Sequence, residues 1–186
     1  DISKEIVARF SPDELYQRAL TWAGKYDPET KELLNADPEY LKKIFAIERV
    51  GALKPRKDLG RWSEIKTEIA YFFDTTFSVS PDLITATLTE LNGVEANDII
   101  SDFLYSYNPK DNPEQWFEKL KEVGEKHGFT GNNQDYKANP EKYRGQVGTI
   151  AKLLRVLLTG RTQTPNLCLI MQVMGLERIT KRLKTF

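Results

Sequence analysis

The fold class is decided by the C-terminal stretch Gly145–Phe186, which reads GQVGTIAKLLRVLLTGRTQTPNLCLIMQVMGLERITKRLKTF. Its first part repeats apolar residues at a spacing of three and four, which predicts a helix with one apolar face. Gly160 is expected to end that helix. Thr164-Pro165 is expected to begin the next one, with a capping oxygen followed by proline at the first helical position. Gly175 then separates a third, short helix.

The same stretch is strongly basic, although Lys+Arg and Asp+Glu are equal at 27 each in the whole chain. Its basic residues are Lys152, Arg155, Arg161, Arg178, Lys181, Arg182 and Lys184. Glu177 is its single acid. Such a surface attracts phosphate, and the alternative is a solvated face around an apolar core. The net-neutral composition makes no case for nucleic acid by itself, so any such case rests on this local cluster.

The rest of the chain predicts an all-α protein of about eight or nine helices and no strand. Four further helix starts combine a capping side chain, proline and acids, at Ser11, Asp37, Ser80 and Asn112. Amphipathic runs at 62–73 and 98–107 add two helices. The segment 74–80 breaks the helical pattern, which predicts two helical lobes, residues 1–77 and 78–186. Residues 130–144 are expected to form an irregular loop.

Several classes of site are not supported by the composition. The single cysteine, Cys168, is expected to be buried and inert, and it is compatible with a reducing cytoplasm. The single histidine, His127, is interpreted as a surface cap at a helix end. One histidine and one cysteine far apart predict no metal site. No apolar run is long enough for a membrane span, and a chain beginning at Asp1 without methionine is expected to be part of a longer protein.

The runs LLRVLLTGR, TPNL and MGLERITKRL resemble, in order and spacing, the C-terminal signature of bacterial-type glutamyl-tRNA synthetases. The resemblance covers about forty residues and implies a helical bundle that holds the anticodon loop of tRNA. It implies that Arg155, Thr164, Pro165 and Leu167 form the pocket for the first two anticodon bases. For Leu167 the alternative is core packing, and for Thr164 and Pro165 it is simple capping.

Two further positions follow from the same resemblance. Arg49 aligns with the arginine that reads the third anticodon base, and its alternative is a structural arginine before Gly51. Lys121 aligns with a basic position that contacts the anticodon backbone, and its alternative is an ordinary exposed lysine.

The family's two amino-acid activation motifs, His-x-Gly-His and Lys-Met-Ser-Lys-Ser, are absent from this sequence. The resemblance therefore implies that ATP and magnesium act in a catalytic domain outside this chain, with no cofactor in the chain itself. The expected partners are that domain and tRNA for glutamate, or also for glutamine, but neither DNA nor a membrane. The competing hypothesis is a free-standing helical module that binds RNA generally or docks a protein through Met171 and Met174.

Overall fold

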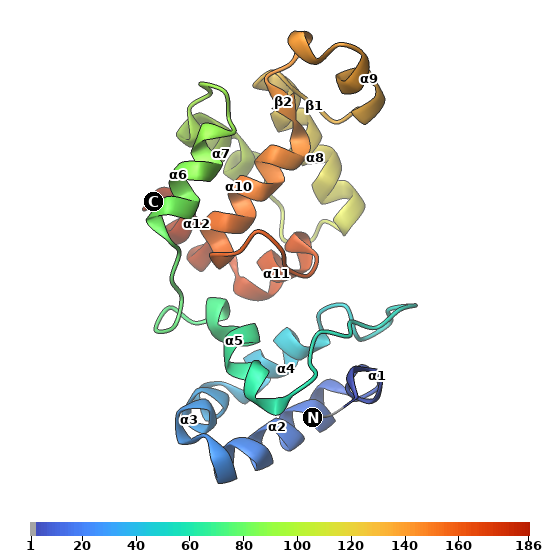
Figure 1. The fold of residues 1–186 in the computed structure, drawn as a ribbon, viewed down its shortest axis with the longest axis vertical. Helices are drawn as coiled ribbons and strands as arrows, with labels where there is room; N and C mark the ends of the chain where they lie inside the picture. The colour runs from blue at the N-terminus through green and yellow to red at the C-terminus, as the bar shows by residue number, and fades with distance from the viewer. Residues whose placement is uncertain (1–2) are drawn as a thin grey trace. The chain divides into compact units, whose positions relative to one another are not determined.

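A computed structural model describes residues 3–186, which divide into two compact units with the chain boundary between Thr76 and Phe77. The described residues are mostly helical, which confirms the all-α prediction (Figure 1). The first unit contains α1 Lys4–Val7, α2 Pro12–Tyr26, α3 Pro28–Ala36, α4 Pro38–Ala46, the 3-10 turn η1 Trp62–Glu64, α5 Ile65–Ile69 and the 3-10 turn η2 Ala70–Phe72. None of the helices in residues 3–186 is long and apolar enough to cross a membrane.

The second unit is built around one central helix, α10, which packs against α6, α8 and α12 (Figure 1). Its elements are α6 Pro81–Thr89, α7 Ala96–Ser106, α8 Pro113–Lys126, β1 Phe129–Thr130, α9 Asn133–Ala138, the 3-10 turn η3 Pro140–Lys142, β2 Gly145–Gln146, α10 Val147–Thr159, α11 Leu167–Met174 and α12 Leu176–Lys184. The approach of α8 to α10 is close because Gly124 has no side chain, and a Cβ there would lie 2.6 Å from Val147. Gly124 thus allows the two helix backbones to come close together.

The predicted helix starts are mostly confirmed. Proline occupies the beginning of α2, α4, α6 and α8, and the side chains of Ser11, Asp37 and Asn112 each accept a backbone N–H of the first turn. Ser80 makes no such bond. Three α-helices exceed the nine that the sequence predicted: α1, α3 and α9. The start of α3, Asp27-Pro28-Glu29, has the same signature as the others and could have been recognised.

The prediction that Thr164-Pro165 begins a helix is wrong. Helix α11 begins at Leu167, and Asn166 caps it by accepting the N–H of Leu169 at 3.3 Å. The Thr164 hydroxyl instead accepts from Arg155 Nε and donates to the carbonyl of Pro165. The strongest sequence signal for this helix start was therefore two residues early.

Residues 130–144 are more ordered than the predicted loop. They contain α9 and η3, and the flanking strands β1 and β2 pair in parallel, with Phe129 opposite Gly145 and Thr130 opposite Gln146. Asn132 caps α9, and the hydroxyl of Tyr143 donates to Asp135, which lowers the pKa of that carboxyl. The segment is therefore a structured loop whose two ends are held side by side by the strand pair.

His127 ends α8 as predicted, but its side chain is not a surface group that faces helix carbonyls. Its Nε2 lies 2.7 Å from the Asp102 carboxylate on α7, and only 13% of the side chain is exposed. Lys126 also binds Asp102, and these two contacts lower the pKa of Asp102, the larger effect coming from Lys126. The histidine therefore ties α8 to α7.

Gly160 should be sensitive to substitution. Its φ of 69° is left-handed, and an added Cβ would overlap the carbonyl oxygen of Ser78. We expect Gly160→Ala to lower the free energy of unfolding by about 1–3 kcal/mol or more. Urea denaturation followed by circular dichroism measures this change. Gly148→Ala, on the exposed side of the same helix with no atom within 4 Å, is the control and should be neutral or stabilising by up to about 1 kcal/mol. Equal effects of the two changes would contradict this reading of the turn.

Cys168 should react slowly while the protein is folded. Burial raises the pKa of its thiol to about 11, compared with about 8.5 for a free cysteine. Because only the thiolate reacts, alkylation by iodoacetamide at pH 8 should be at least about a hundredfold slower in buffer than in urea. Mass spectrometry of timed samples measures this difference, and similar rates would show that α11 opens readily.

Candidate nucleic-acid interface

Among the basic residues of the C-terminal stretch, Arg155 is the one best placed to contact a ligand. It lies on the partly exposed side of α10, and its Nε donates to Thr164 Oγ1 at 3.0 Å. Within the described chain it makes no ion pair, and its two terminal amino groups donate to no protein atom. Partial burial lowers the pKa of the guanidinium, and no neighbouring charge contributes to that shift. Arg155 therefore keeps its planar pair of outer N–H donors available.

The turn after α10 is shaped by local bonds that bring Thr164 back to Arg155. Thr159 Oγ1 donates to the Arg155 carbonyl at 2.7 Å and accepts the N–H of Arg161 at 3.2 Å. Gly160 reverses the chain in its left-handed conformation. These contacts close the last turn of α10, so Thr164 stands where its hydroxyl orients Arg155.

Arg182 is a basic residue of the same stretch that does not belong to its surface. The residue is 6% exposed, Nη1 donates to the carbonyl of Leu158 at 2.7 Å, and the guanidinium lies 3.7 Å from the centre of the Phe77 ring. It thereby satisfies one of the free carbonyls at the end of α10. The helical spacing from Ile179 and Leu183, both fully buried, could have indicated this inward position.

The charge that faces solvent is reduced further because Lys152 pairs with Glu90, the residue that follows α6. Not all seven basic residues of the stretch are therefore available to bind phosphate. Counting basic residues in the sequence overestimated the positive charge that faces solvent.

Leu167 lies in the core of the unit and is 2% exposed. It cannot serve as an apolar platform for a base without leaving that core, which favours the packing alternative. Pro165 is partly exposed and precedes the helix cap Asn166. Of the four residues expected to form one pocket, the structure brings Arg155, Thr164 and Pro165 together through hydrogen bonds.

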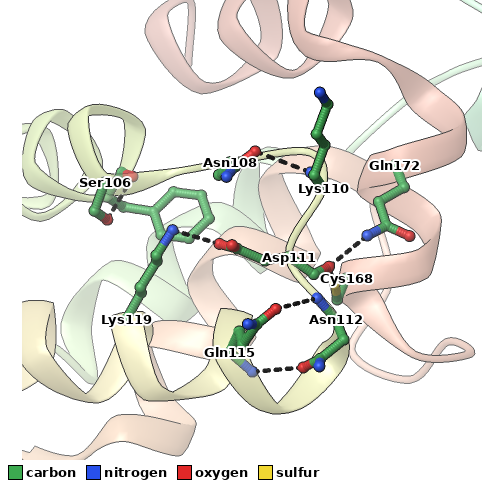
Figure 2. A network of polar contacts seen from close by, with 10 residues as sticks. Ser106, Asn108, Lys110, Asp111, Asn112, Gln115, Lys119, Cys168 and Gln172 are labelled. Atoms are coloured by element: carbon green, nitrogen blue, oxygen red, sulfur yellow. Dashed lines mark hydrogen bonds and ion pairs between the residues drawn. The ribbon is translucent and has the colours of Figure 1, made fainter.

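A polar network anchors α11, the helix that follows this turn (Figure 2). The connection between α7 and α8 presents the carbonyl of Asp111, which accepts Gln172 Nε2 at 2.6 Å and lies 3.7 Å from Cys168 Sγ. The largely buried Asp111 carboxylate pairs with Lys119 at 2.6 Å. The network fixes the helix that follows the turn, and its charged members neutralise each other.

Lys121 lies on α8 and is not joined to Arg155 or Thr164 by any hydrogen bond or ion pair in the described residues. Its ammonium pairs with Glu118 at 2.6 Å, and its stem packs over Gly131, where an added Cβ would lie 2.5 Å from it. The side chain is 28% exposed. Contact with a phosphate would require it to exchange Glu118 for the ligand.

Arg49 lies in the first unit and is buried, with 6% of the residue exposed. Nη2 donates to Asp58 at 2.5 Å, and Nη1 donates to the carbonyl of Phe45 at 3.2 Å. Burial, followed by the charge of Arg56, lowers the pKa of Arg49 to about 10 although Asp58 opposes the shift. This guanidinium holds the segment after α4 and, as it lies here, presents no donor to a base.

The alternative in which Met171 and Met174 form a docking face is wrong, because these residues are 0% and 4% exposed. Both methionines fill the core between helices. Residues 3–186 also contain no group of three or more His, Cys, Asp or Glu side chains that could hold a metal ion.

Residues 132–186, which include α9 to α12 and the whole Arg155–Thr164 turn, match the family model described as anticodon binding domain. On the basis of this similarity, residues 132–186 are called the anticodon binding domain. The complete chain is 37% identical over 188 residues to a protein named glutamate--tRNA ligase from Clostridium perfringens strain SM101, of which it covers 34%. Proteins of the same name from Acetivibrio thermocellus and Sorangium cellulosum are 34% and 32% identical over 99% and 100% of the chain.

The chain spans about a third of the length of these curated relatives and aligns with their C-terminal part. The anticodon binding domain therefore corresponds to the C-terminal half of the second unit, and the resemblance seen in the sequence is confirmed.

The bond between Arg155 and Thr164 predicts unequal effects of two substitutions within the anticodon binding domain. Thr164→Ala removes the hydroxyl and should lower the free energy of unfolding by about 0.5–1.5 kcal/mol. Thr164→Ser keeps the oxygen and should cost less. Urea denaturation of both variants tests the bond, and an alanine variant as stable as the serine variant would show that the hydrogen bond contributes nothing.

Proposed function

We propose that this chain reads the anticodon of tRNA for glutamate as the C-terminal part of a glutamate–tRNA ligase. One observation carries the proposal: the family match includes a turn at which Arg155, unpaired with any carboxylate in the described chain, is oriented by Thr164. The likeness of the whole chain to proteins named glutamate--tRNA ligase supports the choice of glutamate.

The chemistry of the turn suits an unpaired base. Single-stranded loops expose base edges, and sequence-specific RNA recognition usually targets them. The two outer nitrogens of Arg155 can donate in parallel to two acceptors on a base or to a phosphate. Because the side chain is partly desolvated and already held at Nε, it loses less freedom on binding than a mobile surface arginine would.

Thr164 is proposed to act through Arg155. Its oxygen accepts from Arg155 and its hydrogen is directed to the carbonyl of Pro165. The hydroxyl is therefore committed to holding the guanidinium in place.

The bond-forming chemistry of such a ligase is placed outside this chain. We propose that ATP and magnesium act in a catalytic domain that this sequence does not include, because the sequence has neither activation motif. The chain would then contribute selection of the tRNA, while glutamate activation and transfer occur elsewhere in the enzyme.

Replacing Arg155 tests the proposal directly. Arg155→Ala should weaken binding of tRNA for glutamate by about 1–3 kcal/mol, or about 5- to 150-fold, if the guanidinium makes a bidentate contact. Arg155→Lys keeps the charge but not the planar pair of donors, so it should recover only part of the affinity. Fluorescence anisotropy with labelled tRNA at fixed low salt is the measurement, and affinity should fall as salt rises.

Lys137→Ala is the matched control, since Lys137 is an exposed cation on α9 of the same domain. It should change affinity little. A tRNA with a substituted anticodon and a DNA duplex complete the design. Equal binding of the normal and substituted tRNA would indicate a general RNA-binding module, and equal affinity of wild type and Arg155→Ala would refute the assigned site.

A further inference from the structure

The first unit carries a surface pocket that the anticodon binding domain does not explain. It has a volume of about 360 Å³, which lies within the range of roughly 300–1,000 Å³ usual for small-ligand sites. One wall is the outer side of α2, with Trp22 and Tyr26, and Trp62 of η1 completes the lining. The pocket is therefore formed entirely by residues whose mutual placement one unit determines.

The aromatic rings of this pocket are not used to build the core. The core side of α2 is formed by Leu15, Ala19 and Ala23, all fully buried. Trp22 and Tyr26 lie one turn apart, with ring centres 6.0 Å apart and planes tilted by 39°, and Tyr26 is 64% exposed. Trp62 is also partly exposed, so two of the three tryptophans in the chain line one open site.

Positive charge borders these rings. Lys25 Nζ lies 5.4 Å from the centre of the Tyr26 ring and makes no ion pair in the described part of the chain. Arg18, on the other border, is paired with Glu14 at 2.8 Å and lies 4.4 Å from the centre of the Phe10 ring. Lys25 is therefore the cation available to a ligand's anionic group.

We propose that this pocket binds a nucleoside 5′-phosphate, with the base stacked among Trp22, Tyr26 and Trp62 and the phosphate beside Lys25. Flat aromatic side chains next to positive charge are the usual means of holding single nucleotides, because every base has a π-face and every phosphate is anionic. A proline-rich peptide also suits an aromatic groove, but it offers no anion to Lys25. The nucleotide is either free or an unpaired residue of an RNA, and the site is independent of Arg155.

The test uses the whole chain and its intrinsic tryptophan fluorescence. Adenosine 5′-monophosphate should quench the signal saturably, adenosine should bind more weakly, and inorganic phosphate alone should have no effect. Trp116 is buried in the second unit and supplies a constant background. Competition with tRNA distinguishes the two sources, because only an RNA nucleotide that occupies the pocket would displace the mononucleotide.

Variants assign the effect to the pocket. Trp22→Ala and Trp62→Ala should each weaken binding of the mononucleotide about fivefold or more, whereas Trp22→Phe should retain most of it. Lys25→Ala should remove the difference between the nucleotide and adenosine. Tyr105→Ala, which removes an aromatic ring that is 96% exposed on α7, is the matched control and should change nothing. Circular dichroism verifies that each variant is folded.

Absence of saturable quenching at millimolar nucleotide would overturn the proposal. So would equal weakening by Tyr105→Ala, or quenching by a proline decamer in place of the nucleotide. Arg155→Ala should leave mononucleotide binding unchanged even where it weakens tRNA binding, so failure of this inference and failure of the proposed function are distinguishable.

Discussion

The burial of α10 is the constraint on which the second unit depends. Six of its residues, Ile150, Leu153, Leu154, Val156, Leu157 and Leu158, are each at most 2% exposed, so the helix is surrounded by neighbours on most of its circumference. A helix buried in this way has only a narrow side on which a charged residue can reach water. Arg155 occupies that side. The core thus determines the direction in which the Arg155 side chain points toward solvent, and the bond to Thr164 determines the final orientation of its guanidinium.

The end of α10 shows how tightly this arrangement is held. Arg182 donates to the carbonyl of Leu158, and Gly160 passes close to the backbone of Ser78. Phe77 lies against the Arg182 guanidinium. The first residues of the second unit therefore pack on its last helix around the turn that presents Arg155. Rigidity at this point is useful for recognition, because a preorganised donor loses less conformational entropy when it binds.

Buried arginines explain why charge counting was a poor guide to the site. Arg49 and Arg182 look like Arg155 in the sequence, yet one pairs with Asp58 and the other binds a carbonyl and an aromatic ring. An arginine stem is largely apolar, so the residue can lie inward whenever its donors find partners there. Helical spacing can indicate that an arginine lies inward, as for Arg182, but its partners come from segments distant in the chain, such as Phe77.

The sequence by itself determined the helical class and most helix starts, because capping, proline and helical periodicity are local properties. The family of the C-terminal stretch was indicated separately, by the resemblance of its motifs. The start of α3 followed the same rule and was simply not recognised. Only the tertiary structure decided that Asn166 and not Thr164 caps α11, that Leu167 is a core residue, and that residues 129–146 close on themselves as a parallel strand pair. It also decided which arginine stays available to a ligand. The strand pair and the availability of Arg155 depend on contacts between residues far apart in sequence, and such contacts leave no periodic signal along the chain.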